Sequence, residues 1–237
     1  MTSFALVNQS TETSLTPEVC TAIAAAVQTQ IVRDYGSLWQ AGPAPVRFCT
    51  AESDAAPADT LIVLLDDADQ QGALGYHDLT PAGRPYARIF VKTILANGGS
   101  LTAGPNSVSV CVSHEALEVL GDPYCNCYAD SPVAQYAWEL CDPVEGDSYQ
   151  VNGVSVSDFV GPRWFDPEDK GGPWDMLSVL RGPMSLAPNG YVIQRSPGGQ
   201  ATAVFGDLYP SWKRDQKVAL GSRFRRRRKV ARFADSQ

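Results

Sequence analysis

The chain has few histidines and no long apolar run, and both shortages narrow its expected function. Only His77 and His114 carry an imidazole among 237 residues. No apolar run approaches the roughly 20 residues that cross a bilayer, so no membrane role is expected. Residues 1–14 lack a basic region followed by an apolar core, so no secretory signal is expected either.

Taken together, the cysteines form no closely spaced set. The six cysteines are too widely dispersed to indicate a disulfide scaffold, which favours reduced thiols made in a cytoplasm. A chain of 237 residues can bury one substantial core, or a core and a small appended domain. We therefore expect one main domain with an irregular C-terminal part.

Charge is distributed unevenly along the chain. Residues 223–237 carry seven basic side chains against Asp235, a charge of +6, and the net charge of −7 leaves −13 for residues 1–222. Basic clusters of this kind bind an acidic protein surface or a phosphate backbone, or are simply solvated, and charge alone leaves these alternatives open. The basic residues of this tail are Arg223, Arg225, Arg226, Arg227, Arg228, Lys229 and Arg232.

The apolar pattern predicts an α+β fold with a mixed sheet. A capping hydroxyl at Thr16 precedes Pro17, and apolar residues then recur every four positions, which predicts a helix over about 17–36. The continuous apolar run Thr60–Leu65 is typical of a central strand. Further expected elements are strands over 44–50, 73–79, 87–94 and 153–159, a short helix or strand over 135–141, and a hairpin over 190–205.

A second helix is predicted over 107–120, although its valines alternate with polar residues as they would in a strand. Asn106 can cap this segment, and Gly121 followed by Asp122-Pro123 is a helix stop. Many β-branched residues in a helix usually indicate that the helix is buried. The sheet is expected to pack on the N-terminal helix and on this buried one.

This helix carries the one motif with recognisable chemistry. His114-Glu115-x-x-Glu118 matches the zinc-protease pattern His-Glu-x-x-His with the second histidine replaced. Positions i and i+4 of a helix share a face, and carboxylate oxygen is an accepted zinc ligand. The pattern therefore predicts His114 and Glu118 as ligands, and Glu115 as the general base toward a water.

A third ligand must come from elsewhere in the chain. Glu139 is the best candidate, because it lies 25 residues beyond His114 and the third ligand of the gluzincin class, which includes thermolysin, is a Glu at similar spacing. Zinc is the expected metal, although two carboxylates select it less strongly than two histidines do, which leaves manganese and calcium open. The alternative ligands are Asp122, Asp142, Glu145 and His77, and Asp122 or Asp142 is also a candidate for orienting His114.

A simpler interpretation of the motif stays open. His114 then packs beneath the helix, and Glu115 and Glu118 form an ordinary solvated helix face, since a bare His-Glu-x-x-Glu recurs often by chance.

The order of elements resembles the N-terminal half of zincin metallopeptidases, closer to metzincins in layout and to gluzincins in ligand spacing. Several blocks also resemble an uncharacterised family of tailed-bacteriophage and prophage proteins, some of which have a similar Ser/Arg-rich C-terminus. These blocks are Leu65–Pro81, Ser113–Pro123, Trp138–Glu145 and Val156–Phe165.

The phage resemblance implies a zincin-like core over 1–165, followed by an irregular subdomain with a hairpin over 166–222 and the basic tail over 223–237. It implies a virion-associated structural protein, made in the host bacterial cytoplasm, in head decoration, head completion or the connector region. Its tail would contact other virion proteins or packaged DNA. The alternative is an active zinc-dependent metallopeptidase of phage or prophage origin.

Overall fold

The computed structural model describes residues 2–70, 72–211 and 213–214. The chain forms two compact units, and each combines separate stretches of sequence. The first unit is Met1–Leu120 with Ser148–Ser157, and the second is Gly121–Asp147 with Asp158–Gln237. Helices accompany a mixed sheet, which confirms the predicted α+β class. Within the described residues, no helix has both the length and the apolar character that crossing a membrane requires.

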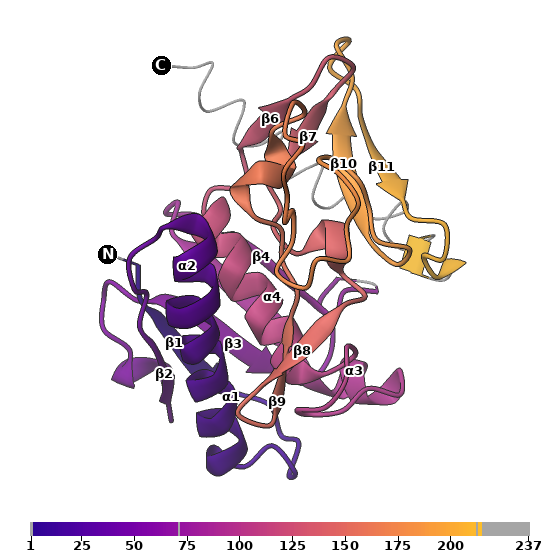
Figure 1. The fold of residues 1–237 in the computed structure, drawn as a ribbon. Coiled ribbons are helices and arrows are strands. Elements are labelled where there is room, and N and C mark those ends of the chain that lie inside the picture. The colour runs from indigo at the N-terminus through magenta and orange to yellow at the C-terminus, as the bar shows by residue number, and fades with distance from the viewer. Residues whose placement is uncertain (1, 71, 212, 215–237) are drawn as a thin grey trace. The chain divides into compact units, whose positions relative to one another are not determined.

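A five-stranded sheet forms the centre of the first unit (Figure 1). Four strands run parallel and only the edge strand β4 runs antiparallel, pairing with β5 so that His77 lies opposite Ala87. In sheet order the strands are β2 (Val46–Cys49), β1 (Phe4–Asn8), β3 (Thr60–Leu65), β5 (Pro85–Phe90) and β4 (Gly75–Leu79). The central strands β1 and β3 are mostly apolar, and Phe4–Val7 and Ile62–Leu64 are buried because both faces of these strands are covered.

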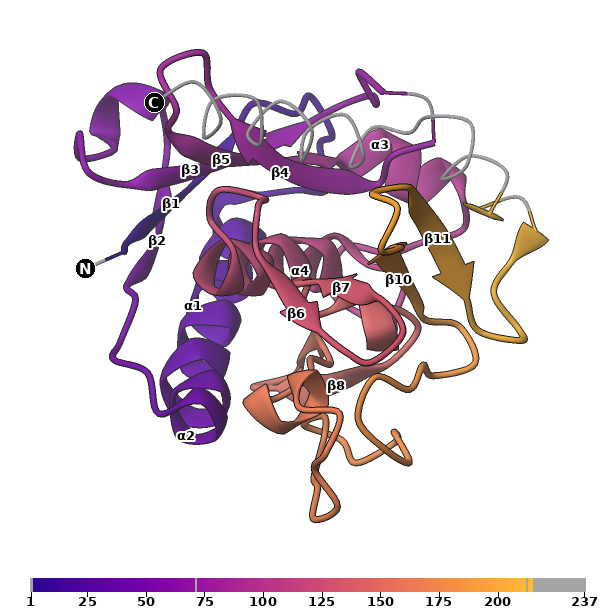
Figure 2. The same ribbon diagram turned by 90° about the horizontal axis from the view of Figure 1, so that it is seen from above.

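Two long helices, α1 (Pro17–Gln30) and α4 (Val108–Gly121), lie on the same face of this sheet (Figure 2). The Thr16 side chain accepts a hydrogen bond from the Val19 N–H and caps α1, as predicted. Helical structure continues from α1 through a π-helical turn, Ile31–Tyr35, into the short α2 (Gly36–Trp39). The hairpin of β8 (Ser148–Val151) and β9 (Val154–Ser157) belongs to the same unit and contacts α1.

The second unit contains an antiparallel four-stranded sheet and long irregular segments. Its strands in order are β11 (Ala201–Phe205), β10 (Tyr191–Arg195), β7 (Gln135–Ala137) and β6 (Tyr128–Asp130). Aromatic residues supply much of its core: Tyr191 and Tyr209 pack together, and Trp164 is fully buried. The predicted hairpin over 190–205 is confirmed as β10 and β11.

Several boundaries differ from the sequence-based expectations. Strand β1 was not predicted. The strand expected over 87–94 ends at Phe90, and the helix α3 (Val91–Ala96) follows, with buried Val91 and Ile94 on one helix face. The two compact units also divide the chain elsewhere than at residue 165, because β6 and β7 pair with the sheet that contains β10. The basic tail over 223–237 lies outside the described residues.

Candidate metal centre

Helix α4 is buried on nearly every side, as its valines predicted. Eleven of its fourteen residues are buried, including His114, Glu115 and Glu118. Valine is a weak helix former, so tertiary packing rather than propensity stabilises this helix. Its first turn is capped by the Ser107 hydroxyl, which accepts from the Val110 N–H, and not by the expected Asn106.

The motif of α4 does not form a solvated helix face. Glu115 is 2% exposed and Glu118 is fully buried, so the prediction of a solvated face at these two glutamates is wrong. The Nε2 atom of His114 lies 2.9 Å from Oε1 of Glu118, as residues at i and i+4 should. Ligand atoms of His114, Glu115 and Glu118 all lie within 4.8 Å of one another.

The other histidine of the chain joins this cluster from the edge strand. The Nδ1 atom of His77 on β4 lies 3.3 Å from a carboxylate oxygen of Glu115 and 3.3 Å from one of Glu118. His77 is 1% exposed. The first unit therefore gathers both histidines of the sequence and two glutamates in one buried cluster.

A glycine permits the close approach of β4 to α4. A Cβ atom added at Gly75 would lie 2.5 Å from Sγ of Cys111, a separation that real Cβ atoms do not adopt. Gly75 begins β4 and Cys111 lies one helical turn before His114. The small residue thus lets the strand come near enough for His77 to reach the glutamates of the helix.

The charge of this cluster favours a cation. If both imidazoles are neutral, the Glu115 and Glu118 carboxylates give it a formal charge of −2. Buried charges in proteins are normally paired with opposite charges or coordinate metals, since removing a carboxylate from water costs several kcal/mol. A divalent ion would balance both carboxylates at once.

The donor spacing also suits a metal. Zinc binds imidazole nitrogen and carboxylate oxygen at about 2.0–2.2 Å, so adjacent ligand atoms of a tetrahedral site lie roughly 3.3–3.5 Å apart. The separations between His77, His114 and the two glutamates are 2.9 and 3.3 Å. Small side-chain adjustments would bring these atoms to the required spacing. The residues present therefore fit a divalent metal.

The other predicted ligands belong to the second unit, and their roles at the metal stay predictions. Glu139 and Asp142 are buried. Asp122 accepts hydrogen bonds from the backbone N–H groups of residues 126 and 127, which gives its carboxylate a structural task. Glu145 accepts from the Tyr209 hydroxyl at 2.7 Å and pairs with Lys213 at 3.5 Å.

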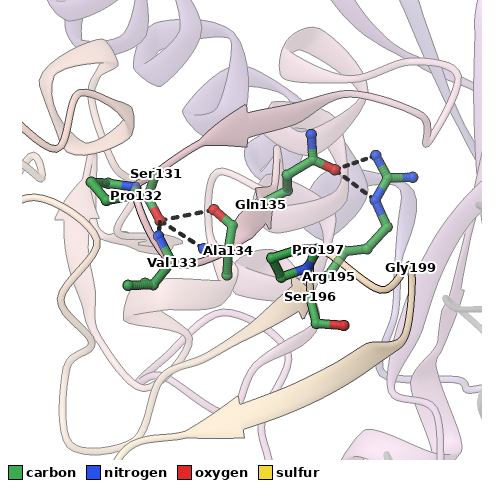
Figure 3. Close-up of a pocket in the computed structure, with 9 residues that line it drawn as sticks. All are labelled: Ser131, Pro132, Val133, Ala134, Gln135, Arg195, Ser196, Pro197 and Gly199. Carbon is green, nitrogen blue, oxygen red and sulfur yellow. Dashed lines mark hydrogen bonds between the residues drawn. The ribbon is translucent and has the colours of Figure 1, made fainter.

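A pocket of about 490 Å³ lies in the second unit, between the β6–β7 and β10–β11 turns (Figure 3). Arg195 on one side donates two hydrogen bonds to the side-chain oxygen of Gln135 on the other. None of the residues lining this pocket is a histidine, cysteine, aspartate or glutamate. The pocket therefore carries none of the predicted ligands or bases.

Comparisons with known proteins identify no relative for this chain: no protein-family model, no curated protein and no solved structure matches it. The function must therefore be inferred from the chemistry of the site.

Sequence reasoning gave His77 only a secondary place among the candidate ligands, and it did not predict a role for the buried polar residue Ser113. His77 was predicted only as an alternative ligand, because nothing in its local sequence marks a metal ligand. Strand alternation was the available signal, since side chains at even spacing along an edge strand share a face. Ser113 precedes the motif and is fully buried, but no pattern distinguished it from the other serines.

Proposed function

We propose that the first unit holds a divalent metal ion, with zinc the expected ion, through His77, His114 and Glu118, in a centre of hydrolytic type. The observation that carries this proposal is the convergence of both histidines and two buried glutamates from β4 and α4. The antiparallel edge strand beside a His-Glu helix also supports the zincin-like arrangement inferred from the sequence.

The residues divide the chemistry between them. His77, His114 and Glu118 would bind the ion, which when bound supplies a Lewis acid and acidifies a water. Glu115 is the general base: its carboxylate accepts the proton of the attacking water and returns it to the leaving group. The burial of Glu115 excludes bulk water from that proton transfer.

Metal content tests the proposal directly. The full chain, purified and supplied with zinc, should retain about one equivalent of metal after dialysis, and Glu118→Ala should retain much less. Glu145→Ala is a matched control, because Glu145 has partners of its own in Tyr209 and Lys213. Wild-type protein without stoichiometric zinc, manganese or calcium would overturn the proposal.

We also propose a virion-associated role, in head decoration, head completion or the connector region. The sequence blocks that resemble phage proteins support it, and so does the contrast between an acidic body and the basic tail over 223–237. Such a tail can bind an acidic capsid surface or packaged DNA. Deletion of residues 223–237 should abolish incorporation into particles, whereas normal incorporation of the shortened chain would contradict this role.

A further inference from the structure

A closed ring of hydrogen bonds lies behind the metal-binding face of α4. The Ser113 hydroxyl donates to the Gln30 side-chain oxygen at 2.6 Å, and the Gln30 amide nitrogen donates to the Ser157 carbonyl at 2.8 Å. The Ser157 N–H completes the ring by donating to the Ser113 hydroxyl at 3.0 Å. All three residues are fully buried. The ring joins α1, α4 and the β8–β9 hairpin.

The orientation of the Gln30 amide is fixed by its surroundings. Its nitrogen also donates to the Tyr149 hydroxyl at 3.2 Å, and Tyr149 donates in turn to Asp34 at 2.7 Å. A flipped amide would place its oxygen against the Ser157 carbonyl oxygen and lose the bond to it. Buried polar networks with every member satisfied hold a single arrangement, because each alternative leaves a buried group without a hydrogen bond.

The ring acts on the helical turn that carries the candidate ligands. Ser113 is the residue immediately before His114, so a tether at Ser113 fixes both the rotation and the axial position of that turn. His114 lies 2.9 Å from Glu118, and small rotations of α4 would change its distance to His77 on the sheet. Metal ligands tolerate deviations of only about 0.2 Å.

We propose that Gln30 and Ser113 are positioning residues of the metal centre, and that their ring with Ser157 holds α4 so that His114 and Glu118 stay in place relative to His77 on β4. This inference rests on the proposed metal-binding function. It assigns a task to two fully buried polar side chains that do not themselves bind the metal. A helix held only by apolar contacts would lack this directional restraint.

Ser109 provides a matched control within the same helix. It lies one turn before Ser113, is also fully buried, and donates to the Ser155 carbonyl of the same hairpin at 2.7 Å. Ser109→Ala therefore also removes a buried hydroxyl and its hydrogen bond to the hairpin backbone, but farther from the candidate ligands. Ser113→Ala and Ser109→Ala should destabilise the metal-free protein to a similar extent.

Zinc titration of the metal-free full chain separates these two serines. We expect Ser113→Ala and Gln30→Met to weaken zinc affinity by about tenfold, within the range measured for residues that orient ligands. Ser109→Ala should change the affinity by less than about twofold. The double variant should bind zinc about as weakly as either single variant, because one break opens the ring.

Cobalt spectra provide a readout that a merely structural role would not move. The visible absorption of bound Co²⁺ depends on the arrangement of its ligands, so it should change in Ser113→Ala and Gln30→Met and stay as in wild type in Ser109→Ala. Gln30→Met keeps the side-chain volume and carries the same test if Ser113→Ala does not fold.

The outcomes distinguish the two proposals. If wild-type protein binds neither Zn²⁺ nor Co²⁺, the metal centre itself is wrong. If wild type binds both, but Gln30→Met and Ser113→Ala match the Ser109→Ala control in affinity and spectrum, the metal centre stands and the positioning role is overturned.

Discussion

The Nδ1 atom of His77 lies 3.3 Å from a carboxylate oxygen of Glu118, which joins the antiparallel edge strand of the sheet to its most buried helix. The contact brings a residue from outside the His-Glu-x-x-Glu motif into the motif's own cluster. The two candidate ligands of the helix pattern are thereby joined by a third candidate within the same unit.

His77→Ala should therefore weaken zinc binding by at least about 100-fold, because it removes a nitrogen ligand. Asp78→Asn is the control on the same strand: it changes a neighbouring side chain that alternation directs to the other face. Calorimetric titration of the metal-free chain measures both. Equal affinity in wild type and His77→Ala would exclude His77 from the ligand set.

Glu115→Gln should retain the metal but lose turnover. The amide keeps the size of the side chain and cannot accept the proton of a water, so any hydrolysis of fluorescent casein by the wild type should fall by about 100-fold or more in this variant. Zinc content measured beside the rate is the control, since Glu118→Ala should lower both. Undiminished hydrolysis by Glu115→Gln would remove Glu115 from the role of base.

Bound metal should stabilise the folded chain. At a free zinc concentration of 100 times Kd, selective binding to the native state adds about 2.7 kcal/mol. For a chain of this size that corresponds to a rise in Tm of roughly 5–10 °C. A thermal scan of His114→Ala should show no such rise with zinc, and wild type should show none with magnesium. A similar zinc shift in both proteins would place binding at another site.

Glu139 was predicted from its distance along the sequence, and this prediction can be tested separately. If it supplies a ligand, Glu139→Gln should weaken zinc affinity by about 10- to 100-fold. Glu145→Gln is the matched control, because the structure gives Glu145 to Tyr209 and Lys213. Unchanged zinc affinity in Glu139→Gln would exclude Glu139 from the ligand set.

The sequence predicted those elements of the fold that nearby residues determine, and it missed those that depend on distant residues. Periodicity and the Thr16 cap predicted α1, since a helix buries a stripe that recurs within a few residues, whereas the length of the segment and the stop at Gly121 predicted α4. Strand β1 was not predicted because Phe4–Asn8 is short. Its place between β2 and β3 arises from pairing with residues that are distant in the sequence. The end of β5 was missed because Val91 and Ile94 suit both a strand and one helical turn.

In the candidate site, too, contacts within one element could be predicted from the sequence and contacts between elements could not. The i, i+4 spacing predicted the approach of His114 to Glu118. The position of His77 beside the two glutamates depends on the sheet register and on the absence of a side chain at Gly75. Both are features of tertiary structure that a local sequence pattern does not encode. No local pattern encodes the ring through Gln30, because its members come from three elements that meet only in the fold.

A carboxyl pair in the second unit should make its stability depend on pH. Asp158 and Asp175 are both fully buried, and the charge of Asp175 acts on the Asp158 carboxyl. Burial first, and then the charge of Asp175, raise the pKa of Asp158 to about 8. Burial and Asp175 also raise the pKa of Asp147, which acts in the same direction. Both aspartates of the pair accept backbone N–H groups, so the pair anchors the segments around residues 159, 177, 179 and 180.

The direction of the pH dependence follows from the proton that Asp158 binds in the folded state. Between about pH 4 and pH 8 the folded state keeps a proton on Asp158 that the unfolded chain releases. The stabilisation is therefore complete below the unfolded pKa and is lost as pH rises through about 8, by up to about 1.4 kcal/mol per pH unit. Asp158→Asn should flatten this dependence, because its amide does not titrate in this range and its oxygen can still accept from the backbone N–H groups of Phe159 and Leu177.

Urea unfolding at pH 5 and pH 8, followed by tryptophan fluorescence, measures the difference. The fully buried Trp164 reports on the same unit. Wild type should lose more stability than Asp158→Asn between these two pH values, and Asp147→Asn should fall between them because it removes the smaller contribution. If Asp158→Asn and wild type lose stability in parallel, Asp158 is already ionised in the folded protein and its burial does not make the stability depend on pH.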